Sequence, residues 1–533
     1  MTSRSIHKSM GEKRASYILL LAGVLMAALA EALAGTALSF GRIDMWGDLH
    51  TTSDEFALLD VGYTAAKLCG FMMVPALYAR FRPLYVMLTS CGLMTAFSIF
   101  MTCSHSLYLL VGFRIVQGMA GGIILVGGQT LLFNVFSRKL QPLTQFIFAL
   151  GAVVAPATFV SALQGWMVDA LTWEAMYLAA ALCGLVGFFA LSCIPSGIMA
   201  SSGPKRADVT GFFLFAAAAV CLTYIAQEGS RWNWFEANHI IAMTLCGFTA
   251  LLVCVLRWVV FSWRGSLIRL SVFGNLDFCF GFLVSFVAGV ALFGSTSIIP
   301  GFTLNILDFT ATEAGLLNAP GGLMFCIGLG LTTLLLSFTR VSPLATVPLG
   351  IFLIMTGMWL LSHSTSESGN ADLLIPLLIR GTGLGFLFLS LTIYALGGLS
   401  GSRIAQGVAL FTTHRQFGGL FGVSLLQRYL DHQNALNSSI LSSHLGSGGT
   451  LVAERLQTIQ AALQSRGMEA GEAAKAAVAM LQKSLSLQSG TLSYNEAFFA
   501  IVLVFFVAAP LLILFKIWLS RVPSAKAVTH GGK

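Results

Sequence analysis

Residues 107–134 have the sequence LYLLVGFRIVQGMAGGIILVGGQTLLFN, which contains a single charged residue, Arg114. An α-helix rises about 1.5 Å per residue, so about 20 mostly apolar residues are enough to cross the roughly 30 Å hydrocarbon core of a membrane. This stretch therefore predicts a transmembrane helix. It also predicts one arginine held inside the membrane, where a charge is costly and usually functional.

The whole chain has the composition of a membrane protein. Of its 533 residues, 56% are hydrophobic and 10% are charged, whereas soluble proteins have about 25% charged residues. The net charge of +8 comes from basic residues spread beside apolar segments, which argues against a nucleic-acid partner. The 10 cysteines lie in or beside apolar stretches without metal-site spacing, so we expect neither a metal nor another cofactor.

Fourteen segments meet the same requirement for a membrane span, which predicts an all-α integral membrane protein. Their approximate limits are 17–40, 57–79, 83–103, 107–134, 142–165, 173–195, 210–226, 239–257, 277–299, 315–337, 343–362, 372–397, 403–427 and 494–517. Most Lys and Arg residues fall in the loops on one side, and the short loops on the other side hold only Arg42 and Arg231. Because cytoplasmic loops collect positive charge, we expect both termini in the cytoplasm.

One connection between the predicted spans is long. Residues 431–493 are polar and carry apolar residues at helical spacing, namely Val452, Leu456, Ile459 and Leu463. We expect a pair of surface helices that covers the outer mouth of the protein. The alternative is a docking segment for a periplasmic partner, such as an adaptor that leads to an outer-membrane channel.

Two stretches far apart in the chain resemble each other. GFRIVQG at 112–118 and LIRGTG at 378–383 each place one arginine beside glycines inside an apolar helix. Repeated halves are typical of transporters that move one helical bundle against the other around a central site. The alternative is chance similarity between glycine-rich helices.

On these residues the chain resembles the major facilitator superfamily, and within it the fourteen-span drug:proton antiporters of EmrB/QacA type. RIVQGMAGG at 114–122 is similar to the family's R-x-x-Q-G-x-x-x-G, and RQFGGLFG at 415–422 is similar to R-Q-x-G-G-x-x-G. Residues 229–235 and 311–316 support the resemblance. It implies the major facilitator fold, with two six-helix bundles and two extra helices, and proton-coupled efflux of a drug, metabolite or siderophore across the bacterial inner membrane.

The resemblance also implies a division into domains. The expected parts are a cytoplasmic segment 1–16, an N-terminal six-helix bundle 17–200, two linker helices 201–276, a C-terminal bundle 277–517 that includes a periplasmic loop 430–493, and a cytoplasmic tail 518–533.

Three departures from the family pattern affect the expected function. PALYARFRP at 75–83 keeps the basic residues of the superfamily's G-x-L-x-D-R-x-G-R-R loop but lacks its acid and both glycines. Span 5 keeps only Ala155-Pro156 of a Gly-Pro-rich antiporter motif, and bulky residues there are expected to remove its bend and its close helix packing. Import is therefore the alternative to export. The acid expected near Ala30 is absent, and Glu31 follows it.

Depth along the helices groups four of the intramembrane charges. At about 1.5 Å per residue, Glu31, Lys67, Arg114 and Arg380 lie roughly 10–15 Å from the outer ends of their spans. We therefore expect one cluster of one acid and three bases in the outer half of the membrane.

A carboxylate that gains and loses a proton is the simplest coupling device for a transporter driven by a proton gradient. Glu31 is the first candidate for this role, and Asp60, which shares a helix face with Lys67, is the second. Arg114 would orient the acid, and Gln117 would line the path. The alternative is that Glu31 and Lys67 form a fixed ion pair that sets helix register.

Arg380, Arg415 and Gln416 are expected to line the same cavity. A guanidinium matches the geometry of a carboxylate or phosphate, which suits an anionic substrate, and the alternative is that the arginines only cap carbonyl groups. Phenylalanine and methionine side chains along the cavity would suit amphipathic substrates.

The sequence has no G-x-x-x-x-G-K-[ST], H-E-x-x-H or G-x-S-x-G, so an enzyme is not expected. A non-transporting channel or receptor component is the alternative from another class.

Overall fold

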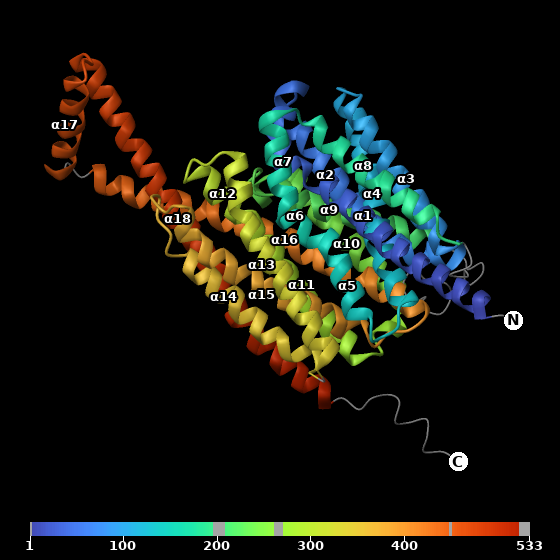
Figure 1. Cartoon of the computed structure of the whole chain (residues 1–533). Coiled ribbons are helices and arrows are strands. Elements are labelled where there is room, and N and C mark those ends of the chain that lie inside the picture. The colour runs from blue at the N-terminus through green and yellow to red at the C-terminus, as the bar shows by residue number, and fades with distance from the viewer. Residues whose placement is uncertain (1–2, 196–207, 261–269, 340, 447–449, 522–533) are drawn as a thin grey trace.

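The computed structural model describes residues 3–195, 208–260, 270–339, 341–446 and 450–521, and within them it contains helices and no strand (Figure 1). The first eight helices are α1 (Ser3–Leu49), α2 (Ser53–Arg80), α3 (Pro83–Thr102), α4 (Leu107–Val135), α5 (Gln141–Ala149), α6 (Ala155–Ala157), α7 (Phe159–Ala170) and α8 (Glu174–Ser192). The others are α9 (Val209–Glu228), α10 (Asn238–Val260), α11 (Leu276–Gly289), α12 (Ser295–Asn305), α13 (Ala311–Phe338), α14 (Val347–Leu361), α15 (Asn370–Leu396), α16 (Ser402–Gly446), α17 (Thr450–Ser465) and α18 (Ala470–Arg521). The all-α prediction is confirmed.

The described part contains 12 helices that are long and apolar enough to cross a membrane, or 13 if the bent pair α5–α6 and α7 forms one span. The remaining predicted span, 403–427, lies in α16, which is not among them. The polar run His414-Arg415-Gln416 lies in the middle of that stretch and lowers its hydropathy. α16 nevertheless runs through the bundle and packs against α2, α11 and α18.

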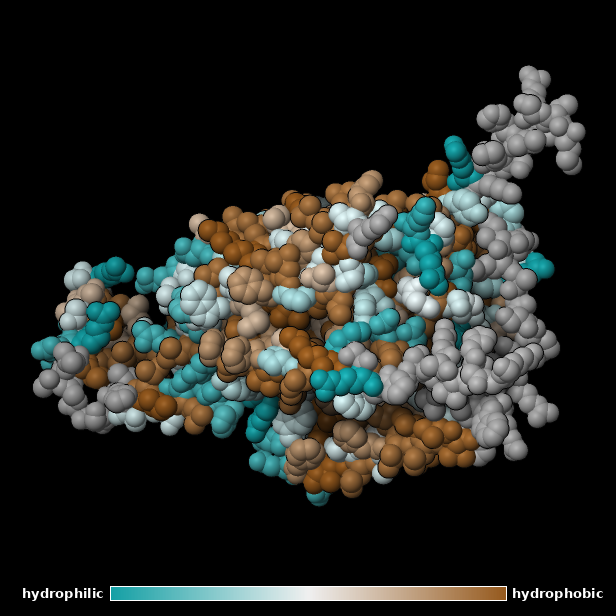
Figure 2. All heavy atoms as spheres, turned by 90° about the horizontal axis from the view of Figure 1, so that it is seen from below, coloured by the Kyte–Doolittle hydropathy of each residue, from teal (hydrophilic) through white to brown (hydrophobic). Residues whose placement is uncertain are grey.

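The described surface suits a lipid environment. Large apolar side chains such as Phe338, Tyr108 and Phe506 are 84%, 76% and 67% exposed. Figure 2 shows apolar residues over much of one face of the molecule. A soluble protein rarely exposes such large apolar patches, so these helices face lipid.

The second and fourth spans of each half pack together in the same register. A β-carbon at Gly118 of α4 would overlap the carbonyl oxygen of Tyr63 on α2, and one at Gly381 of α15 would overlap the carbonyl oxygen of Gly321 on α13. Four residues further along, Gly122 of α4 approaches α2 as Gly385 of α15 approaches α13. Glycine permits this close approach because it has no side chain.

The helix starts repeat as well. Thr52 and Glu55 form a capping box at the start of α2, and Thr310 and Glu313 form one at the start of α13. Each box satisfies free main-chain N–H groups at the first turn. α2 and α13 are the second spans of the two halves, so the internal repetition predicted from the sequence is present in the packing.

Span 5 is bent, contrary to the expectation from its lost glycines. α5 ends in a π-helical turn, Leu150–Val154, and the chain then breaks at Thr158, where α7 begins at an angle of 41° to the preceding helix. The partner helix supplies the glycines for close packing, because Gly315 and Gly322 of α13 lie against the main chain near Ala162 and Ala157. The prediction that the bend and close packing are lost is therefore wrong.

The long connection forms helices, but they do not cover the bundle. The end of α16, α17 and the start of α18 extend away from it at the upper left of Figure 1, and α17 packs against α18. At the base of this hairpin, the Asn437 amide donates hydrogen bonds to Ser493 and Glu496 at 3.1 and 3.2 Å. The expectation of a cover over the outer mouth is wrong, and docking to a partner stays a prediction.

The division into domains stays a prediction too. The expected boundary between the N-terminal bundle and the linker helices, near residue 200, lies outside the described residues, as do 1–2, 261–269 and 522–533 of the expected terminal and linker segments. α9 and α10 pack against each other, and α9 also packs against α2 and α16. The first extra helix, α9, therefore contacts both halves.

Candidate functional site

Glu31 lies at the meeting point of α1, α2 and α4, and it is 2% exposed. Lys67 of α2 brings its Nζ to 2.5 Å from Glu31 Oε1. The Tyr63 hydroxyl, one helical turn away on α2, donates to the same oxygen at 3.0 Å. The predicted pairing of Glu31 with Lys67 is thus present, with Tyr63 as a partner that the sequence reasoning missed.

Arg114 also contacts the Tyr63 ring. Its guanidinium carbon is 4.0 Å from the ring centroid, and its Nη1 donates to the carbonyl oxygen of Ala34 at 2.7 Å. Arg114 is fully buried, and its Nε and Nη2 atoms have no hydrogen-bond partner in the described part of the chain. Tyr63 therefore connects the acid to a second cation.

Glycines of α4 and α1 make room for this site. A β-carbon at Gly121 would lie 2.7 Å from Glu31 Cγ, and one at Gly35 of α1 would lie 3.1 Å from the Tyr63 hydroxyl. Side chains at these positions would displace Glu31 or Tyr63. α4 therefore combines a buried cation, Arg114, with a surface open enough to admit a carboxylate at Gly121, which lies one residue before the last glycine of the R-x-x-Q-G-x-x-x-G pattern.

Two glutamines hold the surrounding helices. Gln117 of α4 donates to Ser98 of α3 at 3.0 Å, so its amide nitrogen contacts a neighbouring helix and not Glu31. Gln164 of α7 donates to the carbonyl oxygen of Leu33 at 2.8 Å and accepts from Thr36 at 2.8 Å. Gln164 is fully buried and links the bent span 5 to α1 beside Glu31. The sequence analysis did not predict this role because no local sequence pattern distinguishes Gln164 from other glutamines.

Asp60 belongs to a different group from Glu31. Gln227 of α9 donates to Asp60 at 3.1 Å and lies 3.5 Å from the hydroxyl of Thr64. The face of α2 that carries Asp60 and Thr64 therefore contacts the first extra helix, whereas Lys67 contacts α1. Gln227 was not predicted, and a single polar residue near a helix end gives no signal of its role.

Arg380 does not join the Glu31 cluster, so the expected group of one acid and three bases is wrong in this respect. Its Nε donates to Ser295 at 3.0 Å and its Nη2 donates to Thr296 at 2.9 Å, both at the start of α12. Equal depth in the membrane does not fix position around the bundle. The observed cluster holds one acid and two bases, Glu31, Lys67 and Arg114.

The glycine contacts also correct the register of the repeat. Matching Gly118 with Gly381 and Gly122 with Gly385 places Arg380 at the position of Gln117, not of Arg114. The sequence comparison of the two arginine stretches was therefore one helical turn out of register.

Arg415 and Gln416 lie on α16 and are half-buried. The guanidinium carbon of Arg415 is 4.5 Å from the ring centroid of Phe388 and 5.5 Å from that of Phe411. These contacts belong to the second half of the chain. The described residues contain no group of His, Cys, Asp and Glu side chains that could hold a metal ion.

Comparisons with known proteins identify the family of the chain. The model of the Major Facilitator Superfamily matches residues 20–423. The colistin resistance protein EmrB of Acinetobacter baumannii is 26% identical over 476 residues, which cover 85% of this chain and 88% of that protein. The fatty acid resistance protein FarB of Neisseria gonorrhoeae is 24% identical over 423 residues, covering 78% and 79%.

The crystal structure of the human organic anion transporter TETRAN matches with a TM-score of 0.53 and 12% identity, covering 93% of this chain and 99% of that one. At this identity the match supports the fold alone. The family consists of membrane transporters, so the predictions of a multi-pass membrane protein and of a protein that is not an enzyme are confirmed. Since the family model matches well over half of its length, the chain belongs to the Major Facilitator Superfamily.

Proposed function

We propose that the chain exports amphipathic small molecules in exchange for protons, with both termini in the cytoplasm of a bacterium and the spans in its inner membrane. The names of its relatives, which include multidrug export and colistin resistance proteins, support efflux of toxic compounds. The observation that carries proton coupling is the buried Glu31 carboxylate, which contacts Lys67 and Tyr63.

The coupling step follows from the charges at this site. When a proton binds the Glu31 carboxylate, the ion pair with Lys67 is lost, and two cations, Lys67 and Arg114, remain without a counter-ion. This arrangement disfavours the present packing of α1 against α2 and α4, because an unpaired charge in low dielectric is costly. When the proton leaves, the ion pair forms again. The protonated and the ionised forms of Glu31 thus favour different arrangements of α1, α2 and α4.

Polar contacts join the two halves on the face opposite the chain ends. Thr312 of α13 donates to Asp169 of α7. Ser230, just after α9, donates to Asp431 of α16 at 2.6 Å, and Arg231 beside it pairs with Asp54 of α2. The loop after α9 therefore bridges the first and second halves. We propose that these contacts close the outer face in this state and separate when it opens.

The proposed function is tested with purified protein in liposomes. Some protein molecules will have their cytoplasmic side on the outside of the liposome. When the lumen is acidic, protons leaving through these molecules should drive the amphipathic substrate into the lumen, and a protonophore should stop this accumulation. Protein-free vesicles and the same vesicles without a pH gradient are the controls. Accumulation that continues unchanged after the proton gradient collapses would exclude proton coupling, and substrate movement in the direction of the protons would indicate import.

A cross-link across the outer face should stop transport. In a Ser230→Cys/Asp431→Cys variant, a short bifunctional thiol reagent should join the loop after α9 to α16, because the native side chains lie 2.6 Å apart. We expect substrate accumulation to fall to the level of protein-free vesicles after cross-linking and to recover when a cleavable linker is cut. Each single-cysteine variant treated with the same reagent controls for the native thiols. Full transport in the cross-linked protein would show that this contact stays closed during the cycle.

A further inference from the structure

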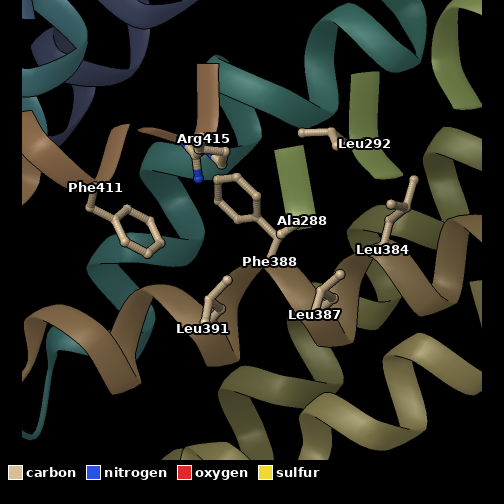
Figure 3. A pocket seen from close by; sticks show the side chains of 8 residues that line it. All are labelled: Ala288, Leu292, Leu384, Leu387, Phe388, Leu391, Phe411 and Arg415. Atoms are coloured by element: carbon tan, nitrogen blue, oxygen red, sulfur yellow. The ribbon is translucent and has the colours of Figure 1, made fainter. Parts of the chain in front are cut away.

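A narrow pocket lies within the second half of the chain, between α11, the turn that follows it, α15 and α16. In this state it has room for only about one water molecule. It is lined by apolar side chains and one cation, namely Ala288, Leu292, Leu384, Leu387, Phe388, Leu391, Phe411 and Arg415. Figure 3 shows the Arg415 side chain beside the ring of Phe388, with leucines from α15 along the rest of the wall. The pocket therefore has one charged end and an apolar remainder.

Arg415 differs from the other two arginines that the structure places inside the helical bundle. Arg114 donates to a main-chain carbonyl, and Arg380 donates to two hydroxyl groups. Arg415 makes ring contacts with Phe388 and Phe411, but among the described residues its guanidinium has no hydrogen bond and no ion pair. Its neighbour His414 is held elsewhere, with Nδ1 at 2.7 Å from the carbonyl oxygen of Phe282.

An unpaired guanidinium in such a place has a clear preference for its ligand. Contacts with aromatic rings stabilise the cation but leave its five N–H donors without acceptors. A carboxylate is planar and accepts two parallel hydrogen bonds from a guanidinium. The leucines around it would bury an apolar chain attached to that carboxylate.

We propose that Arg415 binds the carboxylate of an amphipathic substrate, and that the pocket widens to admit the apolar part of the substrate against Leu384, Leu387 and Leu391. This inference rests on the proposed function, because it names the substrate class of the exporter. It also places the substrate's charge on the second half of the chain, whereas the proton site, Glu31, lies in the first half.

Equilibrium binding of matched probes tests the proposal. Decanoate, decanol and decyltrimethylammonium share an alkyl chain and differ in charge. Radiolabelled decanoate should bind the purified protein in neutral detergent, and Arg415→Gln should weaken its binding by at least about tenfold, the effect of losing one charge-assisted interaction. Decanol should bind both proteins equally. Arg403→Gln, which removes an exposed arginine from the same helix, should bind decanoate as the wild type does.

Two further measurements separate this proposal from simpler explanations. Arg415→Lys keeps the charge but loses the paired donors, so its decanoate affinity should lie between those of the wild type and Arg415→Gln. If Arg415→Gln folds poorly, the comparison of Arg415→Lys with the wild type still tests the proposal. Equal decanoate binding by wild type and Arg415→Gln, or tighter binding of decyltrimethylammonium than of decanoate, would overturn the proposal. The assay needs no proton gradient, so binding without coupled transport would count against the proposed function and not against the pocket.

Discussion

Glu31→Gln should abolish proton-driven transport while leaving folded protein in the membrane. Glutamine has the size of glutamate and still accepts the hydrogen bond from Tyr63, but its amide group cannot bind and release a proton near neutral pH. In liposomes with a pH gradient, substrate accumulation should fall to the level of protein-free vesicles. Exchange of labelled for unlabelled substrate, which requires no net proton movement, should continue.

A second variant separates proton coupling from a structural role of the ion pair. Removing one partner of a buried pair costs about 3–5 kcal/mol, whereas replacing both partners with uncharged residues is often neutral. Glu31→Gln/Lys67→Met should therefore be at least as stable as Glu31→Gln, and it should still lack proton-driven accumulation. If the double variant recovers that accumulation, the Glu31–Lys67 pair only sets the packing of α1 against α2, and another group carries the proton.

Asp60→Asn provides a comparison on the neighbouring helix, α2. Asp60 contacts Gln227 on the first extra helix and not Glu31. We therefore expect Asp60→Asn to retain more proton-driven substrate accumulation than Glu31→Gln. An equal loss of accumulation in both variants would show that Asp60 also carries a proton.

Most of the fold could be predicted because the membrane imposes a simple rule on sequence. Main-chain groups in hydrocarbon must be satisfied within a helix, so apolar length alone marks a span. The signal is weakest where polar residues face the inside of the bundle: His414, Arg415 and Gln416 lower the hydropathy of α16, although the segment 403–427 is still predicted as a span. It also gives no information on bends: span 5 keeps its bend at Thr158, and the glycines that permit close packing there belong to the partner helix.

The charged site was only partly predictable, for a geometric reason. Counting residues gives the depth of a side chain in the membrane but not the helix it faces. Depth counting grouped Glu31 with Lys67 and Arg114, which the structure brings together, and also with Arg380, which instead contacts Ser295 and Thr296. Tyr63 connects Glu31 with Arg114, but an aromatic residue in an apolar helix gives no sign of such a role.

The corrected register of the repeat shows how the two halves differ. With Gly118 matched to Gly381, the positions of Lys67 and Arg114 correspond to Phe325 and Leu377 in the second half. At these two positions the second half keeps the packing of the first but has apolar residues instead of cations, and its own cations, Arg380 and Arg415, lie elsewhere. This asymmetry is expected if the proton site belongs to one bundle and the substrate pocket to the other.

Gly118→Val should prevent the protein from folding stably. A β-carbon at Gly118 would overlap the carbonyl oxygen of Tyr63, and a main-chain atom cannot move aside as a flexible side chain can. Overpacking usually costs about 1–3 kcal/mol, and we expect a larger loss here because α2 and α4 must separate along their whole contact. The separation would also move Tyr63 away from Glu31 and Arg114. The measurement is the yield of monodisperse protein in detergent and its thermal unfolding midpoint.

Gly112→Val is the matched control, because it makes the same change on the same helix at an exposed position. A β-carbon at Gly112 would meet no atom within 4 Å, so yield and unfolding midpoint should stay close to those of the wild type. Gly381→Val should behave like Gly118→Val, since Gly381 lies against the main chain of Gly321 in the second half. If Gly118→Val were as stable as Gly112→Val, the contact between α2 and α4 would not be as close as described. The same result would remove the basis for matching Arg380 with Gln117, because that register depends on these glycine contacts.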